Sequence, residues 1–208
     1  MRFSSQPTAL MVACLIGVLL SGCLTKDGPE TRFYVLGQLP AQVDPLPNIP
    51  HQPPLSVAVT SLRLPRYLER PQIVTRVGAN RLEFAEYHQW GGNLSKNMMR
   101  ALAANLSQLL ATSEVSISGG RPVLPDATRI EIDIIHFERV PNGKVELSAQ
   151  WRVYAPKTDV PALTRITHLN SEKEVAATDM DGIVATMSDQ FGELSRTIAS
   201  AVVALSNR

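Results

Sequence analysis

The chain has 208 residues, and its 20 lysine and arginine residues nearly balance its 19 aspartate and glutamate residues. No segment concentrates basic side chains into the stripe with which nucleic-acid-binding proteins contact phosphates, so we expect no nucleic-acid partner. Removal of the first 22 residues, argued below, leaves 186 residues, enough for one domain with a substantial core.

The N-terminus has the layout of a secretory signal. Arg2 supplies a positive charge, residues 9–20 form an apolar run, and Leu-Ser-Gly-Cys at positions 20–23 matches a lipobox. A helix of about 12 residues covers roughly 18 Å, whereas a hydrocarbon core is about 30 Å thick, so this segment is too short to span a membrane. The alternative is an ordinary signal peptide with a chance cysteine near its end.

The lipobox predicts cleavage between Gly22 and Cys23, after which Cys23 is the N-terminus and carries acyl chains. Each buried methylene contributes about 0.8 kcal/mol, so two or three long chains anchor the protein firmly. Leu24 stands where enterobacterial lipoproteins of the inner membrane have aspartate, which favours the outer membrane. Residues 23–30 then form an acylated tether, whose reach beyond the cysteine is at most about 25 Å. The other cysteine lies in the signal peptide, so we expect no disulfide in the domain of residues 31–208.

The domain begins with an expected strand and a long loop. Residues 32–36 are aromatic and β-branched and predict a strand that ends at Gly37. Residues 37–54 contain six prolines and predict an extended loop that is either mobile or functional. A second strand is expected at residues 55–59, and within residues 62–71 two prolines bracket one turn of helix.

The next segment predicts a hairpin and a helix. Residues 72–77 and 81–85 have strand composition and are joined by a short Gly-Ala-Asn turn. Asn93 then caps a helix whose apolar residues fall on one face, namely Leu94, Met98, Leu102, Leu106 and Leu109. A short strand is expected at residues 114–118.

Residues 130–175 predict a meander of three strands. Isoleucines alternate with charged residues from Arg129 to Ile134, and the phase slips at Ile135 and Phe137, which indicates a β-bulge. A Pro-Asn-Gly-Lys turn leads into residues 145–154, which alternate apolar and polar side chains and pair antiparallel with the preceding strand. The third strand is expected at residues 163–175.

The C-terminal residues predict a long helix over 180–205. Its apolar residues recur every three or four positions: Val184, Met187, Phe191, Leu194, Ile198, Ala201 and Leu205. This spacing is typical of a coiled-coil seam, but the flanks carry few charges, which favours a helix lying across a sheet. Together the elements predict a single-domain α/β fold, with a central mixed, partly antiparallel sheet flanked by two long helices.

The sequence shows no pattern typical of a catalytic, cofactor or metal site. The histidines are scattered, at His51, His88, His136 and His168, and no nucleophile elbow, P-loop or dinucleotide fingerprint occurs. The carboxylates of Glu131 and Asp133 are expected on the polar face of a strand, where such groups are usually solvated. A pair of catalytic carboxylates, as in a glycosidase, stays an open alternative, but no pattern in the sequence indicates one. We therefore expect no enzyme, and no catalytic, cofactor-binding or metal-binding residue.

One segment has the composition of an interface. Leu64, Tyr67, Leu68 and Arg70 lie between prolines and combine apolar, aromatic and guanidinium groups, a mixture enriched at interface hot spots. A contribution to the core explains the same residues and is the favoured interpretation. These four residues form a candidate partner interface.

Three segments of the chain are similar to those of a known family. They are the lipobox, the strand at residues 32–36 and, most specifically, the run Pro-x-Tyr-Leu-x-Arg-Pro-Gln-Ile-Val-x-Arg at residues 65–76. The chain resembles the ABC-type transport auxiliary lipoproteins over the whole mature chain, although members often differ at position 66. The resemblance implies an α/β domain that is lipid-anchored in the outer membrane and faces the periplasm. It also implies an MCE-type intermembrane lipid-transport system, in which this subunit docks a periplasmic MCE-domain tunnel protein.

Further partners and other functions are also to be considered. An inner-membrane protein of the system is expected as a second partner, and copies of this chain could form a ring through the C-terminal helix or the segment around Tyr67. The competing classes are a lipid-tethered chaperone or lipid carrier, which requires an apolar cavity, and a tethered enzyme, which requires convergent titratable groups.

Overall fold

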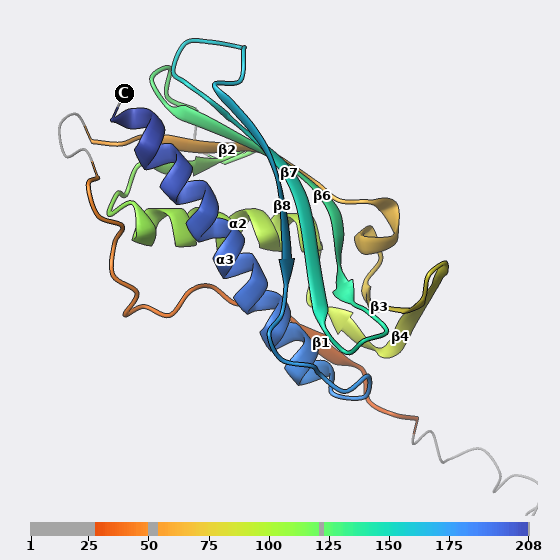
Figure 1. Cartoon of the computed structure of the whole chain (residues 1–208). Helices are drawn as coiled ribbons and strands as arrows, with labels where there is room; N and C mark the ends of the chain where they lie inside the picture. Colours follow the sequence, from red (N-terminus) through yellow and green to blue (C-terminus); the bar gives the residue numbers. More distant parts are fainter. Residues whose placement is uncertain (1–27, 50–53, 121–122, 208) are drawn as a thin grey trace, which may run out of the picture. The chain divides into compact units, whose positions relative to one another are not determined.

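The structure, a computed structural model, describes residues 28–49, 54–120 and 123–207 (Figure 1). The chain divides into two compact units, residues 1–30 and 31–208, and the elements named here belong to the second. In chain order they are β1 (Arg32–Tyr34), β2 (Val57–Arg63), the 3-10 helix η1 (Arg66–Glu69), β3 (Gln72–Gly78), β4 (Arg81–Trp90), α2 (Leu94–Leu109), β5 (Val115–Ile117), β6 (Thr128–Arg139), β7 (Val145–Tyr154), β8 (Leu163–Asn170) and α3 (Met180–Ser206). The predicted cleavage site at Gly22 and Cys23 lies outside the described residues.

The strands form one mixed sheet. Five pairings follow one another along the path β1-β4-β3-β6-β2-β5, and β7 and β8 extend the sheet from the other edge of β6. The pairs β1–β4, β3–β6, β2–β6 and β2–β5 are parallel, whereas β3–β4, β6–β7 and β7–β8 are antiparallel. The predicted α/β fold with a mixed, partly antiparallel sheet and two long helices is therefore confirmed.

Both helices cover the same face of this sheet and pack against each other (Figure 1). α2 contacts β2 and β5, and α3 contacts β6, β7 and β8. Each helix starts at a side-chain cap: Asn93 Oδ1 accepts a hydrogen bond from the Lys96 N–H at 2.9 Å, and Asp179 Oδ1 accepts one from the Gly182 N–H at 2.9 Å. All five apolar residues predicted for the buried face of α2 are buried. The opposite face of the sheet, here called the open face, carries polar side chains along β6, β7 and β8.

The apolar stripe of α3 belongs to the core of this domain. Val184, Met187, Phe191, Leu194, Ile198 and Ala201 are buried, and Leu205 is partly buried. The interpretation as a long helix lying across the sheet is therefore correct. The stripe is not a free coiled-coil seam, and a second copy could not pack on it without opening the core. This removes it from the candidate homo-oligomer contacts.

The bulge predicted in β6 is present and sets which side chains enter the core. The pairing of β6 with β7 shifts between Ile134 and His136. The extra residue allows Ile134 and Phe137, three positions apart, both to point toward the helices, where they are buried. A regular strand turns such residues to opposite faces and would expose one of the two. Ile135 is left at the open face, 40 % exposed.

The proline-rich loop is held against the helices. Its described part, residues 37–49, crosses α2 and α3 (Figure 1). The Gly37 N–H donates to Ser188 Oγ at 2.9 Å, and the Leu39 N–H donates to Asn105 Oδ1 at 2.9 Å. Buried Asn105 also donates through Nδ2 to Ser195 Oγ at 3.0 Å, so one amide joins the loop to both helices. The loop is thus a strap over the helical layer.

β1 and β8 end earlier than expected, by two and five residues. β1 ends at Tyr34, and β8 ends at Asn170 where the sequence predicted a strand reaching Val175. The chain turns after β8 because it bonds the β6–β7 hairpin: the Ser171 N–H donates to the Val145 carbonyl at 2.9 Å, and the Val175 N–H donates to the Gly143 carbonyl at 2.7 Å. Within the described ranges, no helix combines the length and apolar character needed to cross a membrane.

Candidate partner interface

The predicted interface segment fills a gap in the sheet. On one edge of β6, Thr128–Asp133 pair with β2 and Arg139 pairs with Thr75 of β3. Neither strand pairs with the residues between these points, and η1, which connects β2 to β3, lies there. The hydroxyl of Tyr67 is 3.4 Å from the Ile135 carbonyl oxygen, within this gap.

A buried carboxylate closes the gap. Glu138 is fully buried, and its Oε2 accepts hydrogen bonds from the Tyr67 hydroxyl at 2.9 Å and from the Phe137 N–H at 2.8 Å. Its Oε1 accepts two from Arg76, from Nε at 2.9 Å and from Nη2 at 2.7 Å. Four donors thus satisfy a charge that would be costly to bury alone. Tyr67 and Arg76 both belong to the run that carries the family resemblance, so part of that run serves to hold Glu138.

The cluster shifts the pKa of its members in the direction expected for this geometry. Burial, followed by the charge of Glu138, raises the pKa of the Tyr67 hydroxyl far above its usual value. The hydrogen bonds to Glu138 raise the pKa of the Arg76 guanidinium. Tyr67 therefore stays a neutral donor and Arg76 a cation, which is what a buried carboxylate needs.

The four candidate interface residues have different surroundings. Leu68 is 2 % exposed and packs in the core, so it is not a surface residue. Leu64 and Tyr67 are partly buried against the core. Arg70 is exposed and its guanidinium lies 4.8 Å from the centre of the Phe84 ring, a cation–π geometry. The role of Leu64, Tyr67 and Arg70 at a partner interface stays a prediction.

The structure adds apolar surface next to this segment. Ile135 on β6 and Ile166 on β8 are 40 % and 55 % exposed on the open face. Together with His136 and His168 they line a shallow hollow of about 270 Å³. We call these four residues the open-face patch. Since Tyr67 lies beside Ile135, the patch and the predicted segment form neighbouring parts of one surface.

Three described histidines have partners within the fold. His168 Nδ1 lies 2.9 Å from Ser148 Oγ, His88 Nδ1 lies 2.8 Å from the Tyr34 hydroxyl, and His136 Nδ1 lies 3.7 Å from Glu138 Oε1. His51 lies outside the described residues. In the described parts of the chain, histidine, cysteine, aspartate and glutamate form no group of three or more that could hold a metal ion.

The carboxylates of Glu131 and Asp133 are bonded and not simply solvated. Asp133 accepts hydrogen bonds from Arg63 of β2 and, at 2.9 Å, from Arg152 Nη1 of β7. These donors, Arg63 first, lower the pKa of the Asp133 carboxyl. Glu131 accepts one from the Tyr154 hydroxyl at 3.0 Å. The pairs cross three strands of the open face and hold them in register.

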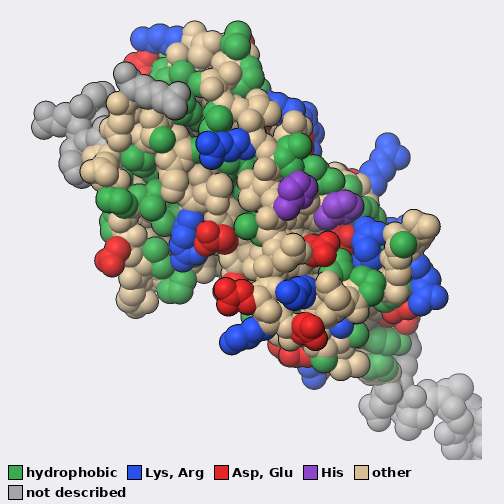
Figure 2. Space-filling view, viewed as in Figure 1, with side chains coloured by type: hydrophobic (Ala, Val, Ile, Leu, Met, Phe, Trp, Pro, Cys, Tyr) green, Lys and Arg blue, Asp and Glu red, His purple; other side chains and the backbone are tan. Residues whose placement is uncertain are grey.

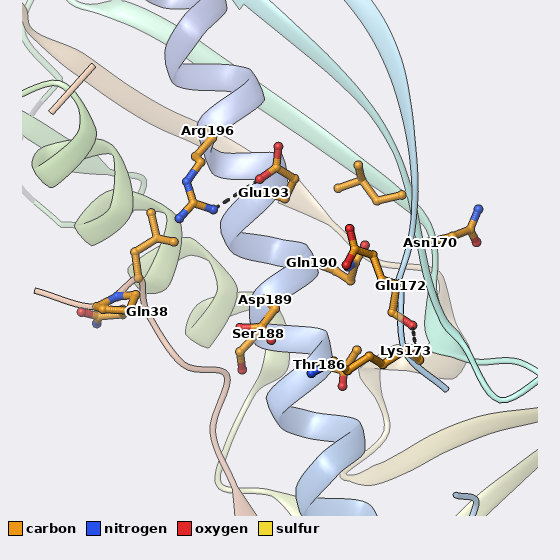
Figure 3. A pocket seen from close by; sticks show the side chains of 14 residues that line it. Gln38, Asn170, Glu172, Lys173, Thr186, Ser188, Asp189, Gln190, Glu193 and Arg196 are labelled. Atoms are coloured by element: carbon orange, nitrogen blue, oxygen red, sulfur yellow. Dashed lines mark hydrogen bonds and ion pairs between the residues drawn. The ribbon is translucent and has the colours of Figure 1, made fainter. Parts of the chain in front are cut away.

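A second hollow lies between α3 and the end of β8 (Figure 3). It has a volume of about 610 Å³, opens to solvent, and has polar or charged side chains around it apart from Leu39, Pro40 and Leu169. Figure 3 shows Arg196 and Glu193 paired along α3, with Nη1 and Oε2 3.3 Å apart. Figure 2 shows acidic and basic side chains interspersed over this face of the molecule. The hollow is thus open and of mixed lining, unlike the closed apolar cavity that a lipid carrier requires.

Two residues of structural consequence were not identified from the sequence. Glu138 follows the phase slip in β6, and that slip was a signal that the nearby polar residues have unusual surroundings. Asn105 sits on the apolar face of α2, where a polar side chain indicates a buried hydrogen-bond partner.

Comparison with known proteins places the chain in a family. Residues 34–199 match the model of the ABC-type transport auxiliary lipoprotein component. A solved structure of a Xanthomonas campestris protein shares the fold with a TM-score of 0.69 at 14% identity, over 85% of this chain and 97% of that chain. A structure described as that of an uncharacterized protein has a TM-score of 0.66 at 17% identity, over 83% of this chain and 99% of that chain. No curated protein matches the sequence.

The two solved structures support the fold alone, because their sequence identities are low. The family model, by contrast, covers most of the chain and includes the Tyr67–Arg76 run, β6 with Glu138, and the larger part of α3. The family consists of membrane-anchored lipoproteins that assist transport, and it is not a family of enzymes. This chain belongs to the ABC-type transport auxiliary lipoprotein family.

Proposed function

We propose that this lipoprotein is the outer-membrane subunit of an MCE-type intermembrane lipid-transport system. In this role acylated Cys23 anchors the domain, which faces the periplasm and docks the end of a periplasmic MCE-domain tunnel protein. An inner-membrane protein of the same system is the second partner. Family membership supports a transport role, and the lipobox followed by Leu24 supports the location.

The need for a docked tunnel follows from lipid chemistry. Exposing one acyl chain to water costs roughly 10 kcal/mol or more, at about 0.8 kcal/mol per methylene, so lipids must cross the periplasm within a closed path. A subunit at the end of that path has to hold a protein surface in place. We assign it no chemical step.

The observation that carries docking is the position of the accessible apolar groups. The space between the sheet and the helices is occupied by large buried side chains, among them Phe137, Trp151 and Phe191, and the rings of Phe137 and Phe191 are 6.3 Å apart. By contrast, Ile135 and Ile166 are exposed on the open face. A lipid carrier would place its apolar groups around an internal cavity, whereas a docking subunit places them on a surface.

A photocrosslinking amino acid placed at residue 166 in membranes from cells tests this proposal. We expect it to capture an MCE-domain protein, because Ile166 is the more exposed of the two isoleucines of the open-face patch. The matched control is residue 160, which is 71 % exposed but lies in the β7–β8 loop, and it should capture none. Capture only of a second copy, or equal capture from both positions, would contradict docking through the open-face patch.

A further inference from the structure

A second exposed apolar group lies where the domain joins its tether. Phe33 and Val35 are 68 % and 64 % exposed, the highest values after Val160 among the large apolar residues that the structure describes. The residues that alternate with them, Tyr34 and Leu36, point inward and pack in or against the core. Over residues 33–36, in β1 and just after it, one side of the chain therefore turns to the core while Phe33 and Val35 turn outward, in place of the usual alternation of apolar and polar residues.

The neighbouring strand leaves this outer side uncovered. Gly91 follows β4 directly beside it, and a Cβ there would lie 3.5 Å from Val35 Cγ1 and 4.0 Å from Phe33 Cβ. Because Gly91 has no side chain, nothing from this position shields the two residues. The register Phe33–Gln89 places Tyr87, which is 39 % exposed, on the same face of β4. Three exposed apolar side chains thus share one surface.

Two cations border that surface. Lys96 and Arg100, both exposed on the first turns of α2, line a hollow of about 120 Å³ together with Val35. Neither forms an ion pair with another residue in the described part of the chain. Aromatic and apolar groups beside unpaired cations match the chemistry of a phospholipid surface, where acyl chains lie below a layer of phosphates.

We propose that Phe33, Val35 and Tyr87, with Lys96 and Arg100, form a membrane patch that rests on the phospholipid bilayer holding the acyl chains of Cys23. The inference rests on the proposed function for its lipid anchor. Phe33 follows Cys23 by ten residues, which extend to at most about 35 Å, so the anchor brings this surface and not the far end of the sheet to the bilayer. In Figure 1, β1 and the β7–β8 loop lie at opposite ends of the domain.

Site-directed spin labelling of the acylated full-length lipoprotein tests the membrane patch. After cleavage the chain has no cysteine besides Cys23, whose sulfur is blocked by its lipid in the proposed anchor, so a nitroxide can be attached selectively to Phe33→Cys, Val35→Cys or Val160→Cys. The proteins are reconstituted in vesicles of phosphatidylethanolamine and phosphatidylglycerol. We expect the labels at positions 33 and 35 to be relaxed severalfold more by lipid-soluble oxygen than by an aqueous nickel chelate, and the label at position 160 to show the reverse.

Two outcomes would overturn the membrane patch. In one, the labels at positions 33 and 160 respond alike, so that both face water. In the other, the labels at positions 33 and 35 are protected from both reagents, as at a contact with a second copy or another protein.

A charge variant tests the role of the two cations. Lys96→Gln with Arg100→Gln should shift the position-33 label toward water in these vesicles and leave it unchanged in vesicles of phosphatidylcholine alone.

These two experiments distinguish a failure of the membrane patch from a failure of docking. If the patch is wrong, crosslinking from residue 166 to the MCE-domain protein persists while the label at position 33 reports water. If docking is wrong, that crosslinking is lost while the label at position 33 stays in lipid.

Discussion

The hydroxyl of Tyr67 donates a hydrogen bond to Glu138 across 71 positions of the sequence, at 2.9 Å. This bond joins η1 to the part of β6 that neither β2 nor β3 pairs with. The cluster is polar and lies on the side of the sheet away from the helices, so it adds order where apolar packing does not reach. Its contribution can be measured one donor at a time.

Tyr67→Phe should reduce the free energy of unfolding by roughly 1–3 kcal/mol, because it removes one donor from a buried charge while keeping the ring. Denaturant unfolding measured by circular dichroism gives this value. The control is Tyr87→Phe, since Tyr87 is exposed, and it should change stability by less than about 0.5 kcal/mol. Equal effects of the two substitutions would show that the hydroxyl of Tyr67 contributes nothing specific.

Arg76→Met should be more damaging, with a loss of roughly 3–5 kcal/mol, because it leaves the Glu138 charge buried with no cation. The double variant Arg76→Met with Glu138→Gln should recover part of this loss, since the remaining group is neutral. Additive losses in the double variant, measured by the same unfolding experiment, would mean that the two side chains do not interact.

The pH dependence of stability should reflect the pairing of Asp133 with Arg63 and Arg152. Hydrogen bonds from these guanidinium groups, Arg63 first, lower the pKa of Asp133 in the folded protein, so the unfolded chain binds its proton more tightly. The stabilisation is therefore complete above the unfolded pKa of about 3.9 and is lost as the pH falls through the lower folded value. Asp133→Asn should flatten the fall in unfolding free energy below about pH 4.

The comparison for this titration is Asp159→Asn. Asp159 also pairs with an arginine, Arg129, at 2.8 Å, but its side chain is 97 % exposed. Solvent screens such a pair, so the substitution should leave stability and its pH profile nearly unchanged. A steeper acid transition in the Asp133 variant than in the wild type would contradict the assigned sign.

Local periodicity was sufficient to predict the elements that depend on it. The helices α2 and α3, the β3–β4 and β6–β7 hairpins and the bulge at Ile135 all have signals within a few residues of sequence. The pairing of β2 with β6 and the position of η1 join segments about 70 residues apart, and no local pattern encodes them. For the same reason a four-residue 3-10 helix could not reveal that Leu68 points into the core while Tyr67 reaches the open face.

The role of the proline-rich loop also depends on distant partners. Its composition predicted an extended chain but not the bonds to Asn105 and Ser188 that hold it on the helices. Asn105→Leu should leave the Leu39 N–H without an acceptor and destabilise the domain by roughly 1–3 kcal/mol. Hydrogen exchange should then quicken in residues 37–49 more than in β7. Uniform quickening throughout the domain would show that Asn105 supports the core and not the strap in particular.

Charge placed on the open-face patch should weaken the partner complex without unfolding the domain. Ile166→Asp and Ile135→Asp each place a carboxylate at a surface from which docking would exclude water. Substitution of an interface hot spot typically lowers the affinity for the partner by roughly tenfold or more. Both side chains are at least 40 % exposed in the free protein, so unfolding free energies should stay within about 0.5 kcal/mol of the wild type. Val160→Asp, at a residue that is more exposed but lies away from the patch, should bind as the wild type does in a titration against the purified MCE-domain protein. Wild-type affinity in both isoleucine variants would place the contact elsewhere, and the exposed residues of the predicted segment, Arg70 first, would be the next to substitute.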